Sequence, residues 1–116
     1  MKEHTMPETI ESEQQADRIQ AAIDVPISMG PGFLNGDVAV KEMTDAMIAA
    51  VHSFQAEEEA AGRGMRPLGT RSVKLFPVLQ ELIACGGGFQ AGRCDADCVA
   101  RTMTSLVREF GDAEKA

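Results

Sequence analysis

Apolar side chains recur at alternating three- and four-residue steps through the middle of the chain, and this period predicts an amphipathic helix. The positions in the repeat are Val40, Met43, Met47, Ala50 and Phe54. Asp37 is the expected N-cap and Gly62 the expected stop, so the helix runs for about six turns. Two heptads are too few for a coiled coil, but they are typical of one side of an antiparallel bundle or of a dimer seam.

A first helix is expected upstream of this segment. Pro7 suits the first turn, and isoleucines and alanines from Ile10 to Ile23 form a narrow apolar stripe. The stripe is expected to end at Val25, because a residue that precedes proline avoids the α region and Pro26 follows. Residues 28–36 are rich in glycine and proline and are predicted to form a loop.

A third helix is expected to open at Arg71 or Ser72 and to stop at the glycine run 86–88. Almost every side of this segment carries an apolar residue, so it is predicted to be the central helix. Pro77 requires either a later start near Lys74, which would put the proline in the first turn, or a kink.

A fourth helix is expected after a cap at Asp95 or Asp97, with a C-terminal stop at Gly111. No stretch alternates polar and apolar residues with the period of a strand. The 116 residues fit one domain. The chain is therefore predicted to be all-α, a single four-helix domain over residues 8–111, antiparallel and bundle-like, homodimeric, with flexible tails at 1–7 and 112–116.

The composition limits the function classes. Eighteen acidic and 11 basic side chains give a net charge of −7, which argues against non-specific nucleic-acid binding. There is no Trp or Tyr on which single-stranded bases would stack. No apolar stretch approaches the roughly 20 residues of a membrane span, and the N-terminus has no apolar signal region. A cytoplasmic protein with reduced cysteines is expected.

The positive charge is concentrated in one band. Residues 62–76 contain no acid and four cations, namely Arg63, Arg66, Arg71 and Lys74. This band would suit the charged rim of a surface that docks an acidic partner or an anion. The alternative is a linker that pairs with the acidic helices of the chain itself.

Three cysteines, Cys85, Cys94 and Cys98, lie close together in the sequence. Their spacing matches no structural zinc pattern, and no fourth ligand lies nearby, so no metal site is expected. Packed core cysteines are the common outcome. Because a helix N-terminus lowers the pKa of a thiol, Cys94 or Cys98 is also a candidate redox residue or source of an intersubunit disulfide.

No catalytic constellation emerges from the remaining residues. His52 lies near the edge of an apolar face, and nothing marks it as the base of a cysteine nucleophile. Consecutive acids at Glu57, Glu58 and Glu59 point about 100° apart and are expected to form a solvated face. The glycine-rich loops lack the lysine of a phosphate-binding loop. The chain is expected to be non-enzymatic and to need no cofactor.

The apolar faces of the second and third helices look large for a four-helix monomer. Uncovered apolar faces indicate an oligomer or a partner. The expected partner or dimer interface comprises Val40, Met43, Met47, Phe54, Leu75, Phe76 and Leu79.

Two stretches carry a resemblance to a known family. They are His52-Ser-Phe-Gln-Ala-Glu-Glu-Glu-Ala-Ala-Gly-Arg63 and Ser72-Val-Lys-Leu-Phe-Pro-Val-Leu-Gln-Glu-Leu-Ile-Ala-Cys-Gly-Gly-Gly-Phe89. Over residues 37–110 the chain resembles the small helical antiactivators of pseudomonad quorum sensing that target the LuxR-type receptor LasR. The resemblance implies a homodimeric regulator that binds the receptor, blocks its dimerisation and so prevents DNA binding. It assigns no individual contact residue.

Two other classes remain open. Small acidic dimers also include secretion or assembly chaperones, which typically carry a sheet as well as helices. The cysteines leave a thiol redox or metal sensor as the third class. Strand content would favour the chaperone, and paired or metal-bound cysteines would favour the sensor.

Overall fold

The computed structural model describes residues 10–111, and the tails predicted at 1–7 and 112–116 lie outside that range. The helices are α1 (Ile10–Asn35), α2 (Val40–Ala60), α3 (Thr70–Gln90) and α4 (Ala96–Leu106), and α4 continues into the π-helical turn η1 (Val107–Gly111). No strand occurs between residues 10 and 111. The prediction of an all-α, four-helix single domain is confirmed.

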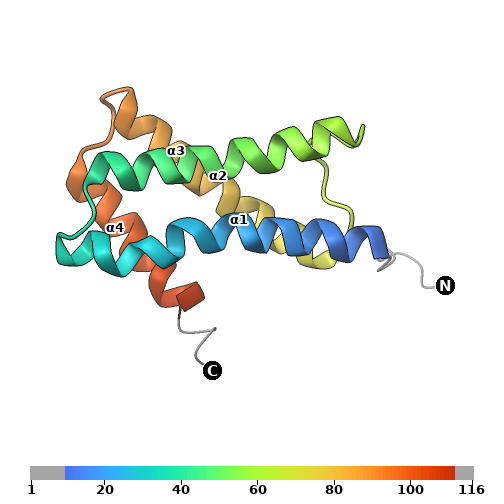
Figure 1. Cartoon of the computed structure of the whole chain (residues 1–116), viewed down its shortest axis with the longest axis horizontal. Helices are drawn as coiled ribbons and strands as arrows, with labels where there is room; N and C mark the ends of the chain where they lie inside the picture. Colours follow the sequence, from blue (N-terminus) through green and yellow to red (C-terminus); the bar gives the residue numbers. More distant parts are fainter. Residues whose placement is uncertain (1–9, 112–116) are drawn as a thin grey trace.

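Helices α1 and α2 run antiparallel, and α3 crosses obliquely behind them (Figure 1). The shorter α4 packs against α1 and α3. The core lies where the four helices meet, because each contributes a fully or almost fully buried apolar stripe. The main core side chains are Ile19, Ile23, Met43, Met47, Phe54, Leu79, Leu82, Val99, Met103 and Leu106.

Helix α2 follows its predicted pattern over 21 residues. The N-cap is Ala39 rather than the predicted Asp37, and the Ala39 N–H donates to the Glu42 carboxylate at 3.2 Å. At the other end Gly62 adopts φ +78°, which suits glycine. This turn lets the Arg63 N–H donate to the Glu58 carbonyl at 3.0 Å, so the helix closes at the predicted place.

Two predictions for the region of helix α1, its end and the loop after it, were wrong. The helix does not end at Val25 but continues through both Pro26 and Pro31 to Asn35, so the predicted loop 28–36 is helical almost throughout. Tertiary packing offsets the backbone hydrogen bonds that proline removes. Pro26 is buried, and Gly30 lies so close to η1 that a Cβ there would stand 2.4 Å from Val107 Cγ2.

Helix α3 begins at Thr70, so the start near Lys74 is wrong and Pro77 lies in the third turn. The helix also runs through the glycine run 86–88, which was expected to stop it. A Cβ on Gly86 would stand 3.0 Å from the Thr44 carbonyl oxygen of α2. Gly86 therefore permits a close crossing with α2, and the glycine run does not end the helix.

The chain stops α3 only at Gly92, which has φ +81°, and the Arg93 N–H then donates to the Gly88 carbonyl at 2.8 Å. Helix α4 starts with the predicted Asp95 cap, whose Oδ1 accepts the Cys98 N–H at 2.9 Å. This short connection holds the N-terminus of α4 beside the C-terminal end of α3.

Candidate functional site

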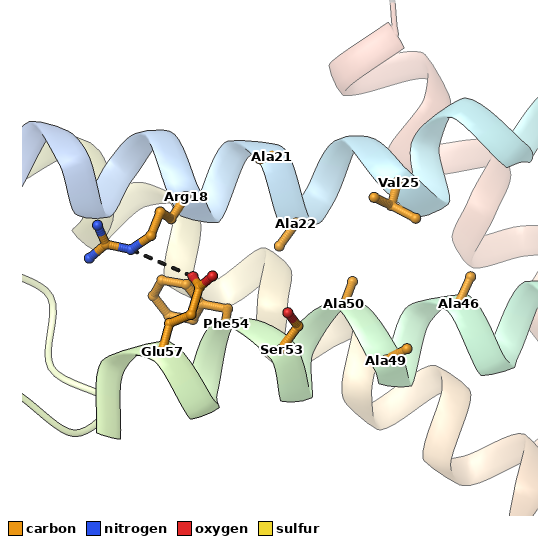
Figure 2. Close-up of a pocket in the computed structure, with 10 residues that line it drawn as sticks. All are labelled: Arg18, Ala21, Ala22, Val25, Ala46, Ala49, Ala50, Ser53, Phe54 and Glu57. Atoms are coloured by element: carbon orange, nitrogen blue, oxygen red, sulfur yellow. Dashed lines mark ion pairs between the residues drawn. The ribbon is translucent and has the colours of Figure 1, made fainter. Parts of the chain in front are cut away.

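A groove of about 400 Å³ runs between α1 and α2 (Figure 2). Its walls consist mainly of alanines, with Ala21, Ala22 and Val25 from α1 and Ala46, Ala49, Ala50 and Ser53 from α2. Val25 is 50% exposed although it is a large apolar side chain. Because the lining side chains are short, another helix would approach the α1 and α2 backbones closely here.

One end of the groove is charged. Arg18 and Glu57 face each other across it, with 3.7 Å between Arg18 Nε and Glu57 Oε1 (Figure 2). Arg18 also donates through Nη2 to Glu58 at 2.6 Å, which fixes the guanidinium in place. The groove therefore offers an apolar length with a polar end.

The residues predicted to form a partner or dimer interface lie in two kinds of place. Met43, Met47, Phe54 and Leu79 are buried in the core of the chain itself and present no surface to a partner. The other three, Val40, Leu75 and Phe76, are half-buried and pack against that core. The apolar stripe of α2 is thus covered within the monomer.

A smaller apolar surface lies on α3. A hollow of about 120 Å³ is lined by Met65, Phe76 and Ile83 above the core residues Val51 and Leu79. Val73, one turn from Phe76, is 45% exposed. We call Met65, Val73, Phe76 and Ile83 the α3 patch.

Two of the four cations in the predicted charged rim pair with acids of the chain itself. Arg63 Nη1 donates to Glu11 at 2.8 Å, and Arg71 Nη1 contacts Glu13 at 2.8 Å and Asp17 at 3.1 Å. All three acids belong to α1. The arrangement is the self-pairing linker considered above.

The other two cations point to solvent. Arg66 is exposed, and its Nε donates to the Arg63 carbonyl at 3.1 Å. Lys74 is also exposed on the first turns of α3. Arg66 and Lys74 are next to Met65 and Val73 of the α3 patch in the sequence.

Glu58 is wholly buried, whereas its neighbours Glu57 and Glu59 are exposed. The expectation of a solvated acidic face was therefore wrong at this position. Arg63 donates through Nε at 2.8 Å and Nη2 at 3.1 Å, and Arg18 donates at 2.6 Å. Hydrogen bonding from Arg63 is the largest cause that lowers the pKa of Glu58 to about 2, against the opposing effect of burial.

Gln15 of α1 completes this buried cluster. Its amide donates to Glu58 at 2.9 Å and to the Arg66 carbonyl at 2.8 Å, and its Oε1 accepts the Leu68 N–H at 2.8 Å. One side chain thus connects α1, α2 and the connection to α3. A sequence signal did exist, because Glu58 follows Phe54 by four residues on the apolar stripe and Gln15 precedes Ile19 by four.

Cys94 and Cys98 are joined by a disulfide within the chain, which corrects the expectation of reduced cysteines. Cys85 is a buried free thiol, and burial raises its pKa. All three line a hollow of about 330 Å³ at the junction of α3 and α4, which we call the sulfur pocket. The predicted redox residues are therefore brought together.

Other catalytic candidates are not assembled. His52 is exposed on α2, and the lining of the sulfur pocket includes no described histidine. Between residues 10 and 111, no group of three or more histidine, cysteine and acidic side chains is arranged to hold a metal ion.

Comparisons with protein-family models, curated proteins and solved structures give no match for this chain. Within the described part, no helix combines the length and apolar character that crossing a bilayer requires. The fold and the geometry of the surface thus define the class of protein, a four-helix all-α domain with a groove between two helices.

Proposed function

We propose that this chain is a non-enzymatic regulatory protein of the cytoplasm that binds a partner protein through the groove between α1 and α2. The expected partner is a transcription factor of the LuxR type, which the sequence resemblance suggests. The groove would hold a helix that the receptor uses for its own dimerisation, and the receptor would then fail to bind DNA.

The groove is the observation that carries this proposal. Its length is apolar and lined by short side chains, and Val25 stands exposed beside it. A partner helix with one apolar face would bury these side chains, and close backbone approach would increase the dispersion contacts. The Arg18–Glu57 pair at one end would orient the helix through its polar residues.

The binding test uses substitutions at exposed alanines. We expect Ala49→Arg to weaken binding of a LuxR-type ligand-binding domain by about tenfold or more, because the new side chain fills the groove. Ala84→Arg makes the same change on an exposed alanine of α3 outside the groove and should bind as the wild type does. Isothermal titration calorimetry measures both, after circular dichroism has verified folding.

The functional readout is the DNA occupancy of the receptor in a gel-shift assay. Wild-type chain should lower the occupancy, and Ala49→Arg should leave it high. Unchanged occupancy at a saturating dose of wild-type chain would reject the receptor as the target. Equal binding by the two arginine variants would instead reject the groove.

We also propose that the chain forms a homodimer through the α3 patch, which leaves the groove free for the partner. Met65 and Val73 are exposed there beside half-buried Phe76 and Ile83. A secretion chaperone remains the alternative function. The absence of strands between residues 10 and 111 counts against it, because the expected chaperones carry a sheet.

A further inference from the structure

The sulfur pocket brings together features that the binding proposal does not use. The Cys94–Cys98 disulfide is half-exposed, so reagents in solvent reach it. The pocket beside the disulfide holds about 330 Å³, enough for a small organic molecule. Cys85 lines the same pocket from α3 but is only 8% exposed. A reachable disulfide and a protected thiol therefore share one pocket.

The two bonded sulfurs occupy different positions on the fold. Cys94 precedes the Asp95 cap and lies outside α4, whereas Cys98 lies in the first turn of the helix. The free N–H groups of a helix N-terminus stabilise a thiolate. Cys98 is thus the better leaving group, and Cys94 is the better target for an incoming thiolate.

The charges around the pocket indicate the kind of thiol that fits. Arg93 lines the pocket beside Cys94, and Glu81 lies on the α3 side. The Asp95 carboxylate is engaged by the Cys98 N–H at 2.9 Å. Arg93 is the cation among the lining residues, so it would attract a reagent that carries a carboxylate.

We propose that Cys94 and Cys98 form a reversible redox site whose reductant is a low-molecular-weight thiol that carries a carboxylate. The first thiolate attacks Cys94 Sγ, forms a mixed disulfide there and releases Cys98 as a thiolate. A second thiolate attacks the reagent sulfur of that mixed disulfide and releases Cys94. Two reagent thiols are oxidised to one disulfide, and the two protons they lose pass to the two cysteines.

The test equilibrates the purified full chain in buffers of defined ratios of reduced to oxidised glutathione. Acid quenching, alkylation and intact mass spectrometry then count the free thiols. We expect a single two-electron transition between one and three free thiols. Peptide mapping of the wild-type chain should assign the new thiols to Cys94 and Cys98, which requires no variant to fold.

Three variants sharpen the assignment. Cys94→Ser and Cys98→Ser should each abolish the transition, and Cys85→Ser should retain it. In Cys94→Ser, oxidised glutathione should form a mixed disulfide with Cys98 faster than it does with Cys94 in Cys98→Ser, because the helix N-terminus stabilises the Cys98 thiolate. Arg93→Gln should slow reduction by glutathione about threefold but should not slow reduction by cysteamine, which has no carboxylate and carries a positive charge.

Two results would overturn the redox site. A disulfide that stays closed in excess reduced glutathione would be a permanent structural link, and three free thiols in excess oxidised glutathione would mean that the pair does not form. Equal effects of Arg93→Gln on glutathione and cysteamine would reject the carboxylate preference. None of these measurements involves a partner protein, so they are independent of the groove.

Discussion

Glu58 is a charged residue in the protein interior, where a charge is tolerated only if hydrogen bonds and opposite charges compensate it. Both of its oxygens accept hydrogen bonds from arginine, and Gln15 supplies another donor. Removing one member of such a cluster leaves the others buried without compensation. The net contribution of the cluster to the free energy of unfolding is smaller than the cost of removing one member, because burying the charges also costs free energy.

Replacing this carboxylate tests the cluster. We expect Glu58→Gln to lower the free energy of unfolding by about 3 kcal/mol, because Arg18 and Arg63 lose their buried counter-charge. Glu59→Gln is the matched control on an exposed neighbour and should change it by less than about 0.5 kcal/mol. Urea unfolding followed by circular dichroism measures both. Equal stabilities would show that solvent replaces the cluster at no cost.

Acid should reduce the contribution of Glu58 to the stability of the wild-type chain. The pKa of Glu58 is about 2 when folded, against an ordinary value of 4.5, so the unfolded chain binds more protons between these values. The stabilisation is complete above about pH 4.5 and is lost as the pH falls towards 2, by about 3 kcal/mol at roughly 1.4 kcal/mol per pKa unit. The urea midpoint of the wild type should be similar at pH 7 and pH 5 and should fall at pH 3, and this fall should be smaller in Glu58→Gln.

At the scale of an element, substitutions in the glycine run of α3 distinguish the effect of helix packing from the effect of helix propensity. A Cβ at Gly86 would press on the Thr44 carbonyl, whereas nothing lies within 4 Å of a Cβ at Gly87. We expect Gly86→Ala to destabilise the fold by about 1–3 kcal/mol and Gly87→Ala to stabilise it by about 0.5–1 kcal/mol. Thermal unfolding compares them. The same sign for both variants would contradict the close crossing of α2 and α3.

Local patterns predicted the elements well where packing agreed with them. The repeat on α2 and the Asp95 cap of α4 are local signals, and both predictions hold. The helix ends predicted at Pro26 and at the glycine run 86–88 were wrong. Contacts with other helices override the local preference of these residues to break a helix. A clue was the apolar stripe of α1, which continues past Pro26 to Ile27.

The candidate site was less predictable than the fold. The apolar stripe of α2 was predicted to form an interface, but Met43 and Met47 are needed to fill the core of a small domain. The groove instead depends on alanines such as Ala49, which carry little pattern of their own. Cys94 or Cys98 was expected to be a redox residue or the source of an intersubunit disulfide, whereas the structure joins the two within the chain and brings Cys85 to the same pocket.

At the scale of the whole molecule, the domain is flat. Its extents are 50 × 33 × 18 Å, and its radius of gyration of 15.1 Å exceeds the roughly 13 Å expected for a compact chain of this length. A flat domain has much surface for its volume, so it leaves apolar side chains uncovered on its faces. The groove and the α3 patch are two such regions.

Measuring the oligomeric state of variants tests whether the α3 patch or the groove forms the interface between two copies of the chain. We expect light scattering to give twice the 12.4 kDa chain mass for the wild type, and Val73→Glu to give the single chain mass by placing a charge in the α3 patch. Ala49→Arg should remain dimeric. A monomeric Ala49→Arg would identify the groove as the seam between copies, and a monomeric wild type would reject the dimer.

The Gln15–Glu58 cluster also has a consequence for proteolysis. Arg63 is a cleavage site for trypsin in the connection between α2 and α3, where exposed chain is usually cut, whereas Arg66 precedes Pro67 and is not. Yet the backbone is held at Arg66 and Leu68 by Gln15 and resists the extended conformation that a protease requires. The native chain should survive limited trypsin at this point, and Glu58→Gln should be nicked there, so the lifetime of the intact chain reports how often the cluster opens.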